Sequence, residues 1–440
     1  MKKVYIETYG CQMNVADTEI IMGLLRKEGF ERTDDASSAD LMLVNTCAIR
    51  DNAEQRVIGR LGELKRHKNG QNLLGVVGCM AQRLGASLLD RCPHVDLIAG
   101  PDGYRSLGQL ILRAGEGDRV ADTEFKAWEH YEDVTPMRSG GASAFVTVQR
   151  GCDHKCTFCI VPMTRGPERS RRLDDVINEI GGLAGRGVSE VTLLGQTVNS
   201  YHDGKSDFAD LLRAAGAVPG IRRVRFTSPH PNDFTDRVIE AMAETPEVCE
   251  HVHLPAQSGS SRVLKRMLRR YNKETFVECV RRLRDAVGGI ALTTDIIVGF
   301  PGETEADFLE TMSLVREVEF DDAFTFRYSV RDGTPAQKLG DVVSKEVSGE
   351  RLSRLIEEVR SIARVKNAAM VGETREVLVE KVARRGELLQ SRTRNNKVVL
   401  LEGTEEDIGG YQTVRITGTT GSTLIGIPAR SVRNELAVVT

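Results

Sequence analysis

Three cysteines on one short loop, Cys152, Cys156 and Cys159, constrain this chain more than any other feature of its sequence. They follow Phe145–Gln149, an alternating apolar run that predicts a β-strand, so the loop is expected at a strand end. Three thiolates in a C-x3-C-x2-C spacing can hold three irons of a four-iron cluster, which leaves the fourth iron without a ligand from this loop. We therefore expect a reaction centre here, with the rest of the chain arranged to present a substrate.

A zinc site is the alternative for such a motif. Structural zinc sites usually pair two C-x2-C knuckles or add histidine ligands. His154 lies inside the motif, where it cannot easily turn back to the same metal, so we expect it to face solvent. The spacing therefore favours an iron–sulfur cluster over zinc.

The composition is that of a globular protein with several domains. A chain of 440 residues is too long for one hydrophobic core. No secretory pattern follows Met1 and no apolar run reaches membrane-spanning length, so we expect a cytoplasmic protein without membrane contact, in which cysteine clusters hold metal and do not form disulfides. The net charge of −3 means that any binding of nucleic acid would depend on local basic patches.

The N-terminal part alternates strand and helix patterns, which predicts a doubly wound α/β domain with a parallel sheet. Each of its first three predicted strands (Val4–Tyr9, Leu41–Val44 and Leu73–Val77) is followed by a cysteine. A lone cysteine in such a place is usually a small buried residue. The carboxyl ends of parallel strands meet at one edge of the sheet, however, so three cysteines in register favour a second cluster site. These cysteines are Cys11, Cys47 and Cys79.

Two further regions follow. Six strand patterns between Phe145 and Tyr328 alternate with helical ones and predict a partial (β/α)6 barrel, whose chemistry is expected at the carboxyl ends of its strands. Short alternating runs between glycine-rich turns then predict a small antiparallel β-barrel. We expect an N-terminal domain over 1–118, a linker over 119–144, the barrel with a connecting helix over 145–370, and the small β-domain over 371–440.

The cysteine loop resembles that of the radical S-adenosylmethionine (SAM) superfamily. The resemblance implies that the open iron binds the amino and carboxylate groups of SAM. It also implies SAM contacts after several barrel strands, although a plain core residue is the alternative for the first of them. The expected SAM contacts are Phe158, Gly195, Gln196, Gln257, Ile297 and Gly299.

The order of the three regions resembles the radical SAM methylthiotransferase family, and Tyr9–Asn14 resembles its tRNA-modifying MiaB branch. The C-terminal part is similar to the TRAM domain, an RNA-binding barrel. The resemblance implies two [4Fe-4S] clusters, one held by Cys152, Cys156 and Cys159 that reduces SAM to a 5′-deoxyadenosyl radical. Cys11, Cys47 and Cys79 would hold the auxiliary cluster, which presents a methylated sulfur.

The implied reaction adds a methylthio group to carbon 2 of isopentenyladenosine next to the anticodon (tRNA position 37), with two SAM consumed. The implied partners are the anticodon stem-loop of tRNA and a low-potential electron donor such as flavodoxin or ferredoxin, and we expect a monomer. For RNA contacts we expect phosphate-binding cations after the cluster loop and in the β-domain. These are Arg165, Arg172, Arg392, Arg394 and Lys397, whereas Arg262–Arg270 is expected to be a solvated face.

Two other readings stay open. A methylthiotransferase of the same family could act on threonylcarbamoyl-adenosine in tRNA or on a ribosomal protein. A protein of another class, a non-catalytic RNA-binding iron–sulfur redox sensor, would use the same cysteines without cleaving SAM.

Overall fold

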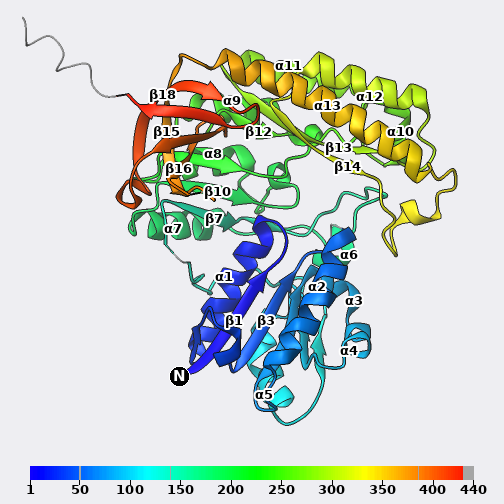
Figure 1. Ribbon diagram of the computed structural model, residues 1–440, viewed down its shortest axis with the longest axis vertical. Helices are drawn as coiled ribbons and strands as arrows, with labels where there is room; N and C mark the ends of the chain where they lie inside the picture. Colours follow the sequence, from blue (N-terminus) through cyan, green and yellow to red (C-terminus); the bar gives the residue numbers. More distant parts are fainter. Residues whose placement is uncertain (49–50, 139, 385, 430–440) are drawn as a thin grey trace, which may run out of the picture.

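The N-terminal domain is built on a six-stranded sheet in the order β2-β1-β3-β4-β5-β6, with every neighbouring pair parallel. The computed structural model describes residues 1–48, 51–138, 140–384 and 386–429 (Figure 1). Central strand β3 is buried at every position and apolar over its first four residues, because helices cover both faces of the sheet. The strands are β1 (Lys2–Thr8), β2 (Phe30–Arg32), β3 (Leu41–Thr46), β4 (Leu73–Gly78), β5 (Leu97–Ala99) and β6 (Val120–Asp122).

Alternate residues of β3 belong to two separate cores. Leu41 and Leu43 pack with α1 (Gln12–Lys27) and α5 (Leu107–Gly115), whereas Met42 and Val44 pack with the helices of the opposite face. The predicted doubly wound α/β fold is confirmed. The remaining elements are α2 (Asp51–Leu64), α3 (Cys79–Leu84), α4 (Ser87–Arg91) and the 3-10 turns η1 (Ala36–Ser38), η2 (Lys65–His67) and η3 (Tyr104–Ser106).

Both edge strands of this sheet, β2 and β6, escaped the sequence analysis because they are short and carry little apolar periodicity. Strand β6 lies inside the predicted linker 119–144 and pairs with β5, so the sheet extends past residue 118.

The central domain is the predicted partial barrel. Two three-stranded parallel sheets, β7-β10-β11 and β12-β13-β14, are joined by a bridge between Val224 and Val248. Their strands are β7 (Ser143–Thr147), β10 (Glu190–Leu194), β11 (Arg223–Phe226), β12 (His251–His253), β13 (Ala291–Val298) and β14 (Asp322–Arg327). The covering helices are α7 (Leu173–Ala184), α8 (Phe208–Gly216), α9 (Asp236–Glu244), α10 (Ser261–Arg266), α11 (Lys273–Ala286), α12 (Glu305–Val318) and α13 (Lys345–Ala369).

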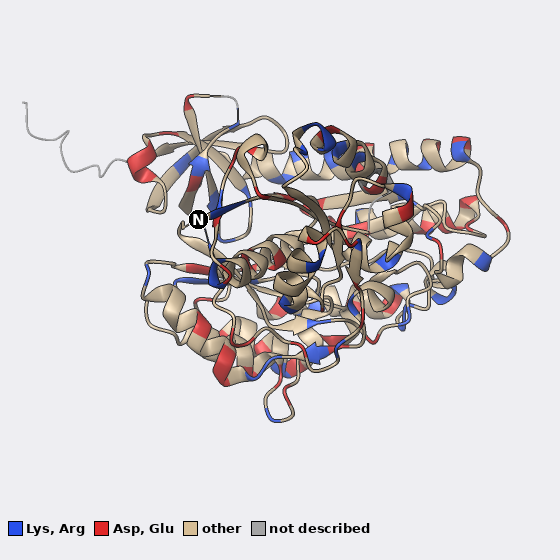
Figure 2. Ribbon diagram, turned by 90° about the horizontal axis from the view of Figure 1, so that it is seen from below, with Lys and Arg blue, Asp and Glu red and all other residues tan. Residues whose placement is uncertain are grey.

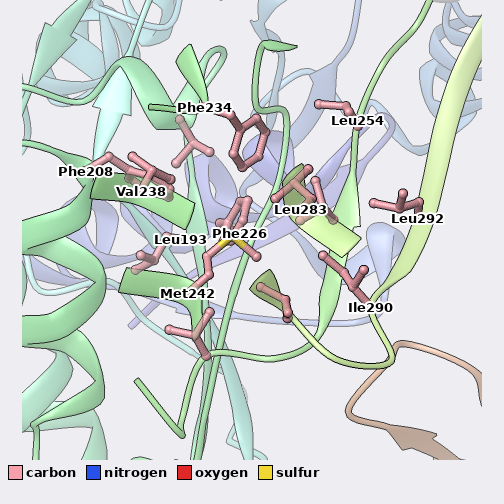
Figure 3. Close-up of a cluster of buried hydrophobic side chains, with 14 of the residues drawn as sticks. Leu193, Phe208, Phe226, Phe234, Val238, Met242, Leu254, Leu283, Ile290 and Leu292 are labelled. Carbon is pink, nitrogen blue, oxygen red and sulfur yellow. The ribbon is translucent and has the colours of Figure 1, made fainter. Parts of the chain in front are cut away.

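Apolar side chains between the strands and these helices form the largest core of the molecule. Figure 3 shows Phe226 of β11 beside Met242 of α9 and near Phe234. The cysteine loop stands at the carboxyl end of this barrel. It is framed by the two-stranded β8 (Gln149–Arg150) and β9 (Arg169–Ser170), with α6 (Val161–Arg165) between them, and the barrel loops carry the 3-10 turns η4 (Val198–Ser200), η5 (Pro231–Asp233) and η6 (Pro335–Lys338).

The C-terminal domain is a closed barrel in the order β15-β16-β17-β19-β18. Its pairs are antiparallel as predicted, except that β17 and β19 run parallel where the barrel closes. Residues 430–440 of the predicted domain lie outside the described residues. The elements are β15 (Thr374–Val382), β16 (Leu388–Thr393), β17 (Val398–Glu402), η7 (Glu405–Asp407), β18 (Tyr411–Thr419) and β19 (Leu424–Pro428).

The small barrel docks beside β10 and β11 of the central domain (Figure 1). Arg223 of β11 is fully buried and donates to the carbonyl of Arg392 at 2.9 Å and to the Glu376 carboxylate at 3.2 Å. Arg225 donates to the carbonyls of Thr393 and Arg394 at 2.9 and 2.8 Å. Guanidinium groups therefore satisfy the carbonyls at the end of β16 across the interface.

Within the described ranges, no helix has the length and apolar character needed to cross a membrane.

We predict that Arg223→Ala weakens this docking by about 3 kcal/mol, because it leaves the Arg392 carbonyl without this donor and removes a buried cation from beside Glu190. Limited proteolysis should then release the C-terminal domain earlier, and the first urea transition should move to lower concentration. Arg375→Ala is the matched control, since Arg375 is 45% exposed and pairs with Glu373 inside the same domain. Equal behaviour of the two variants would contradict the role given to Arg223.

Candidate active site: two cysteine sets at facing strand ends

Cys152, Cys156 and Cys159 lie on the loop between β8 and α6. Cys152 and Cys156 are each only 8% exposed. Burial raises the pKa of the Cys159 thiol to about 12, and the neighbouring Cys156 and Cys152 add to the rise. Three cysteines on one short loop are a suitable donor set for an iron–sulfur cluster, which binds cysteine as the thiolate.

Two side chains from other segments and one backbone amide beside the loop contact these sulfurs. The Thr197 hydroxyl lies 3.2 Å from Cys152 Sγ, and Arg269 Nη1 donates to Cys156 Sγ at 3.3 Å. The Val161 amide donates to Cys159 Sγ at 3.5 Å. Hydrogen bonds to the sulfurs are one of the means by which a protein sets the properties of a cluster.

The prediction of a solvated face over Arg262–Arg270 is wrong for Arg269, which is partly buried and donates to a cysteine of the cluster loop. The chain turns after α10, so Arg269 leaves the helical face on which the prediction was based. Nothing in the local charge pattern separates this arginine from its neighbours, and only the fold places it on Cys156.

His154 is partly buried, contrary to the expected solvent-facing position. Its side chain is 18% exposed, stacks on His230 with ring centroids 4.0 Å apart, and lies 3.3 Å from the Asp233 carboxylate. Burial lowers the pKa of His230 to about 2, so that ring is neutral at physiological pH. The histidine stack fastens the cluster loop to the segment that follows β11.

Cys11, Cys47 and Cys79 follow β1, β3 and β4 at one edge of the N-terminal sheet, as the sequence predicts. A hydrogen bond with Cys47 lowers the pKa of the Cys11 thiol to about 6. A Cβ added at Gly10, whose φ is +148°, would lie 2.8 Å from Cys47 Cβ. The backbone before Cys11 therefore approaches Cys47 so closely that glycine is required there.

Two buried asparagines hold the strand ends together. Asn14 Nδ2 donates to Asn45 Oδ1 and to the Thr46 carbonyl, each at 3.1 Å. Asn45 Nδ2 returns a bond to the Asn14 carbonyl at 2.8 Å. These bonds join the first turn of α1 to the end of β3, so the second cysteine set stands on a rigid base.

The two cysteine sets face each other across the domain interface. Cys79 packs in one apolar cluster with Ala48 and with Ile160 of the cluster loop, and Cys11 borders a cluster that contains Leu194 at the end of β10. Helix α3, which begins at Cys79, contacts α6. The sheet edge of one domain therefore meets the barrel mouth of the other.

Arg165, predicted as an RNA contact, is instead buried between the two cysteine sets. Its Nη2 donates to Asp17 Oδ2 at 2.6 Å, and Arg150 Nη2 donates to Asp17 Oδ1 at 3.1 Å. Asp17 is fully buried, and the two guanidinium groups lower the pKa of its carboxyl against the opposing effect of burial. This three-residue ion pair joins α1 to the cluster loop.

The expected SAM contacts lie at the carboxyl ends of the barrel strands. Phe158 meets Phe300 edge-to-face at 6.5 Å and shares an apolar cluster with Ile297. Gln196 Oε1 is buried without a hydrogen-bond partner among the described residues, which suits a ligand carrying a donor. Gln257 has φ +65° and pairs through its backbone with β13.

The two expected glycine contacts have packing reasons within the protein. A Cβ at Gly195 would lie 2.7 Å from Gln149 Oε1, and one at Gly299, where φ is +71°, would lie 2.6 Å from Ser348 Cβ. Neither position therefore needs a ligand to explain its glycine.

Three of the expected RNA contacts instead form ion pairs, either within the small barrel or between it and the central domain. Arg392 pairs with Glu380 at 2.5 Å, Arg394 with Glu250 at 2.8 Å, and Lys397 with Asp321 at 3.2 Å. Arg172 is 69% exposed and lies 3.8 Å from Asp174. Figure 2 shows Lys and Arg interspersed with Asp and Glu along the ribbon.

Comparisons with known proteins agree with this architecture. Three family models match: "Uncharacterized protein family UPF0004" over residues 3–100, "Radical SAM superfamily" over 146–315 and "TRAM domain" over 368–428. A tRNA-2-methylthio-N(6)-dimethylallyladenosine synthase of Porphyromonas gingivalis is 44% identical over 97% of this chain and 94% of its own length. The chain belongs to this synthase family. The Geobacter metallireducens member is 45% identical, over 97% of this chain and 98% of its own.

Membership of the synthase family confirms the predicted resemblance to radical SAM methylthiotransferases of the MiaB branch. Among solved structures, the radical SAM methyltransferase TsrM of Kitasatospora setae, with cobalamin and a [4Fe-4S] cluster bound, aligns with a TM-score of 0.58. It is 16% identical and covers 77% of this chain and 74% of its own, a likeness that concerns the fold alone.

We predict that anaerobic reconstitution loads about eight irons per chain, from two four-iron clusters. A Cys11→Ala, Cys47→Ala, Cys79→Ala variant should hold about four, because only the loop of the central domain then has its three thiolates. Cys92→Ala is the control, since Cys92 is buried in the core of the same domain away from both sets. A count near four that is the same in the parent and the triple variant would contradict a second cluster.

Proposed function

We propose that this chain is a tRNA methylthiotransferase that converts isopentenyladenosine next to the anticodon, at position 37, to its 2-methylthio form. The observation that carries the proposal is the packing of Cys79 against Ile160, which brings one three-cysteine set to the other. One cluster alone would serve many radical reactions, whereas two facing sites suit a reaction that needs both a radical and a sulfur donor. Relatives that are tRNA-2-methylthio-N(6)-dimethylallyladenosine synthases support this substrate.

In this proposal Cys152, Cys156 and Cys159 hold the cluster that binds SAM, and Cys11, Cys47 and Cys79 hold the auxiliary cluster. When bound, the clusters and SAM supply the electron, the radical, the sulfur and the methyl group. The chain orients them. Arg269 and Thr197 donate to or contact sulfurs of the first set, and Gln196 offers its free carbonyl to the ligand.

The apolar cluster around Phe158, Phe300 and Ile297 would keep water from the ligand. The open edge strand of the barrel, β14, also carries two exposed aromatic side chains, Phe324 and Phe326. Exposed rings of this kind suit stacking against an unstacked RNA base. We propose that the target nucleoside enters the barrel mouth along this edge.

The remaining proposals concern partners. The TRAM domain match supports an RNA substrate, for which we propose the anticodon stem-loop of tRNA. Arg172, the most exposed of the predicted cations, is the one we retain as a phosphate contact. We further propose a cytoplasmic monomer that receives electrons from a low-potential donor such as flavodoxin or ferredoxin.

We predict that tRNA from a strain lacking the gene accumulates isopentenyladenosine and loses the 2-methylthio form. Nucleoside analysis by mass spectrometry measures both, and a plasmid carrying the parent gene or Cys92→Ala should restore the modification where Cys11→Ala does not. The loss of methylthio-threonylcarbamoyl-adenosine instead would indicate the other tRNA substrate. An unchanged tRNA profile together with a change in a ribosomal protein would indicate the methylthiotransferase that acts on ribosomal protein.

The same material separates an enzyme from a redox sensor. Reduced protein incubated with SAM should release 5′-deoxyadenosine. Its absence from protein that carries both clusters would favour the sensor and contradict the proposal.

A further inference from the structure

The ion pair between Asp17 and two arginines carries an unbalanced positive charge beside the second cysteine set. Asp17 supplies one negative charge and is 0% exposed, whereas Arg150 and Arg165 supply two positive charges at 2% and 4% exposure. Burying a charge is costly unless another charge compensates it. One guanidinium therefore lacks a carboxylate in this pair and is expected to face another anion.

The N–H group of Arg165 that has no partner indicates where this anion would bind. Its Nη2 is held by Asp17, while Nη1 is buried with no hydrogen-bond acceptor at good geometry within the described part of the chain. Buried guanidinium N–H groups without a partner are uncommon in native proteins. A hydrogen-bond acceptor that only the loaded protein contains would account for this group.

The second cysteine set lies beside the segment that carries Arg165. Arg165 ends α6, and α6 contacts α3, which begins at Cys79. Cys79 also packs against Ile160, the residue just before α6. This cysteine set therefore faces a buried cation that comes from the other domain.

We propose that Arg165 is a positioning residue for the auxiliary cluster, turned by Asp17 so that its free N–H and its charge face the Cys11, Cys47 and Cys79 ligands. A nearby cation and a donor to cluster sulfur both stabilise the more negative, reduced state. Arg165 thereby raises the reduction potential of that cluster. The inference rests on the auxiliary cluster of the proposed function.

The position of Arg165 in the chain gives this role a second consequence. It is the last residue of α6, which begins two residues after Cys159, so the same short segment carries a ligand of one cluster and the cation of the other. The N-terminal domain must be seated for Asp17 to hold Arg165. Docking of the domains and the properties of the auxiliary cluster are therefore linked through one side chain.

The test uses the full chain with Cys152, Cys156 and Cys159 changed to alanine, so that only the auxiliary cluster remains. Iron per chain is counted, and a redox titration followed by electron paramagnetic resonance measures the one-electron step [4Fe-4S]²⁺ + e⁻ → [4Fe-4S]⁺, with dithionite as the reductant. Arg165→Gln should hold the same iron and show a downward shift of the potential. Arg165→Lys keeps the charge and should show a smaller shift.

Arg138→Gln is the matched control. Arg138 is also a little-exposed interdomain arginine, pairing with Glu19 of α1 at 3.0 Å and Glu179 of α7 at 2.6 Å. Its loss should leave the potential of the auxiliary cluster unchanged. A shift as large as that of Arg165→Gln would show a general effect of loosening the interface and would overturn the inference.

The remaining outcomes separate the two proposals. A background variant that binds no iron would refute the auxiliary cluster, and with it the proposed function. Iron bound with equal potentials in the background and in Arg165→Gln would refute the role of Arg165 alone. If Arg165→Gln binds no iron, the Arg165→Lys variant decides. Iron binding by Arg165→Lys supports the need for a cation at this position. Its failure to bind iron shows a purely structural requirement and overturns the inference.

Discussion

The buried ion pair of Asp17 with Arg150 and Arg165 is the contact on which the rest of the site depends. Asp17 stands on α1 of the N-terminal domain, and both arginines flank the cysteine loop of the central domain. Buried ion pairs add little net stability because desolvation offsets their attraction. The loss of one partner, however, strongly destabilises the protein, because it leaves a buried charge uncompensated. The pair therefore fixes one relative placement of the two domains, which brings Cys79 against Ile160.

Arginine side chains also join the central domain to the C-terminal domain. Arg223 and Arg225 reach from β11 to the end of β16, and Arg394 returns to Glu250 of the central domain. Arginine suits this task because its forked donors satisfy several acceptors at fixed angles. In a chain of three domains, many cations that resemble nucleic-acid contacts by sequence thus join the domains, and the RNA surface must be sought among exposed residues such as Arg172.

Both cysteine sets could be predicted because their signals are local: a strand of period two, and a cysteine just after it. Parallel topology then brings Cys11, Cys47 and Cys79 together without further information. The functions of Arg165 and Arg269 could not be predicted, since each depends on contacts between segments far apart in the chain. Edge strands β2 and β6 were missed for a different reason, because they are short and only partly apolar.

The measurement that most directly tests two facing clusters is the magnetic interaction between them. Fully loaded protein and the two variants lacking one cysteine set each are reduced with dithionite, and their electron paramagnetic resonance spectra are compared. Clusters that meet where Cys79 packs on Ile160 should give the parent protein a split or broadened spectrum that relaxes faster than either variant. A parent spectrum equal to the simple sum of the two variants would contradict the account.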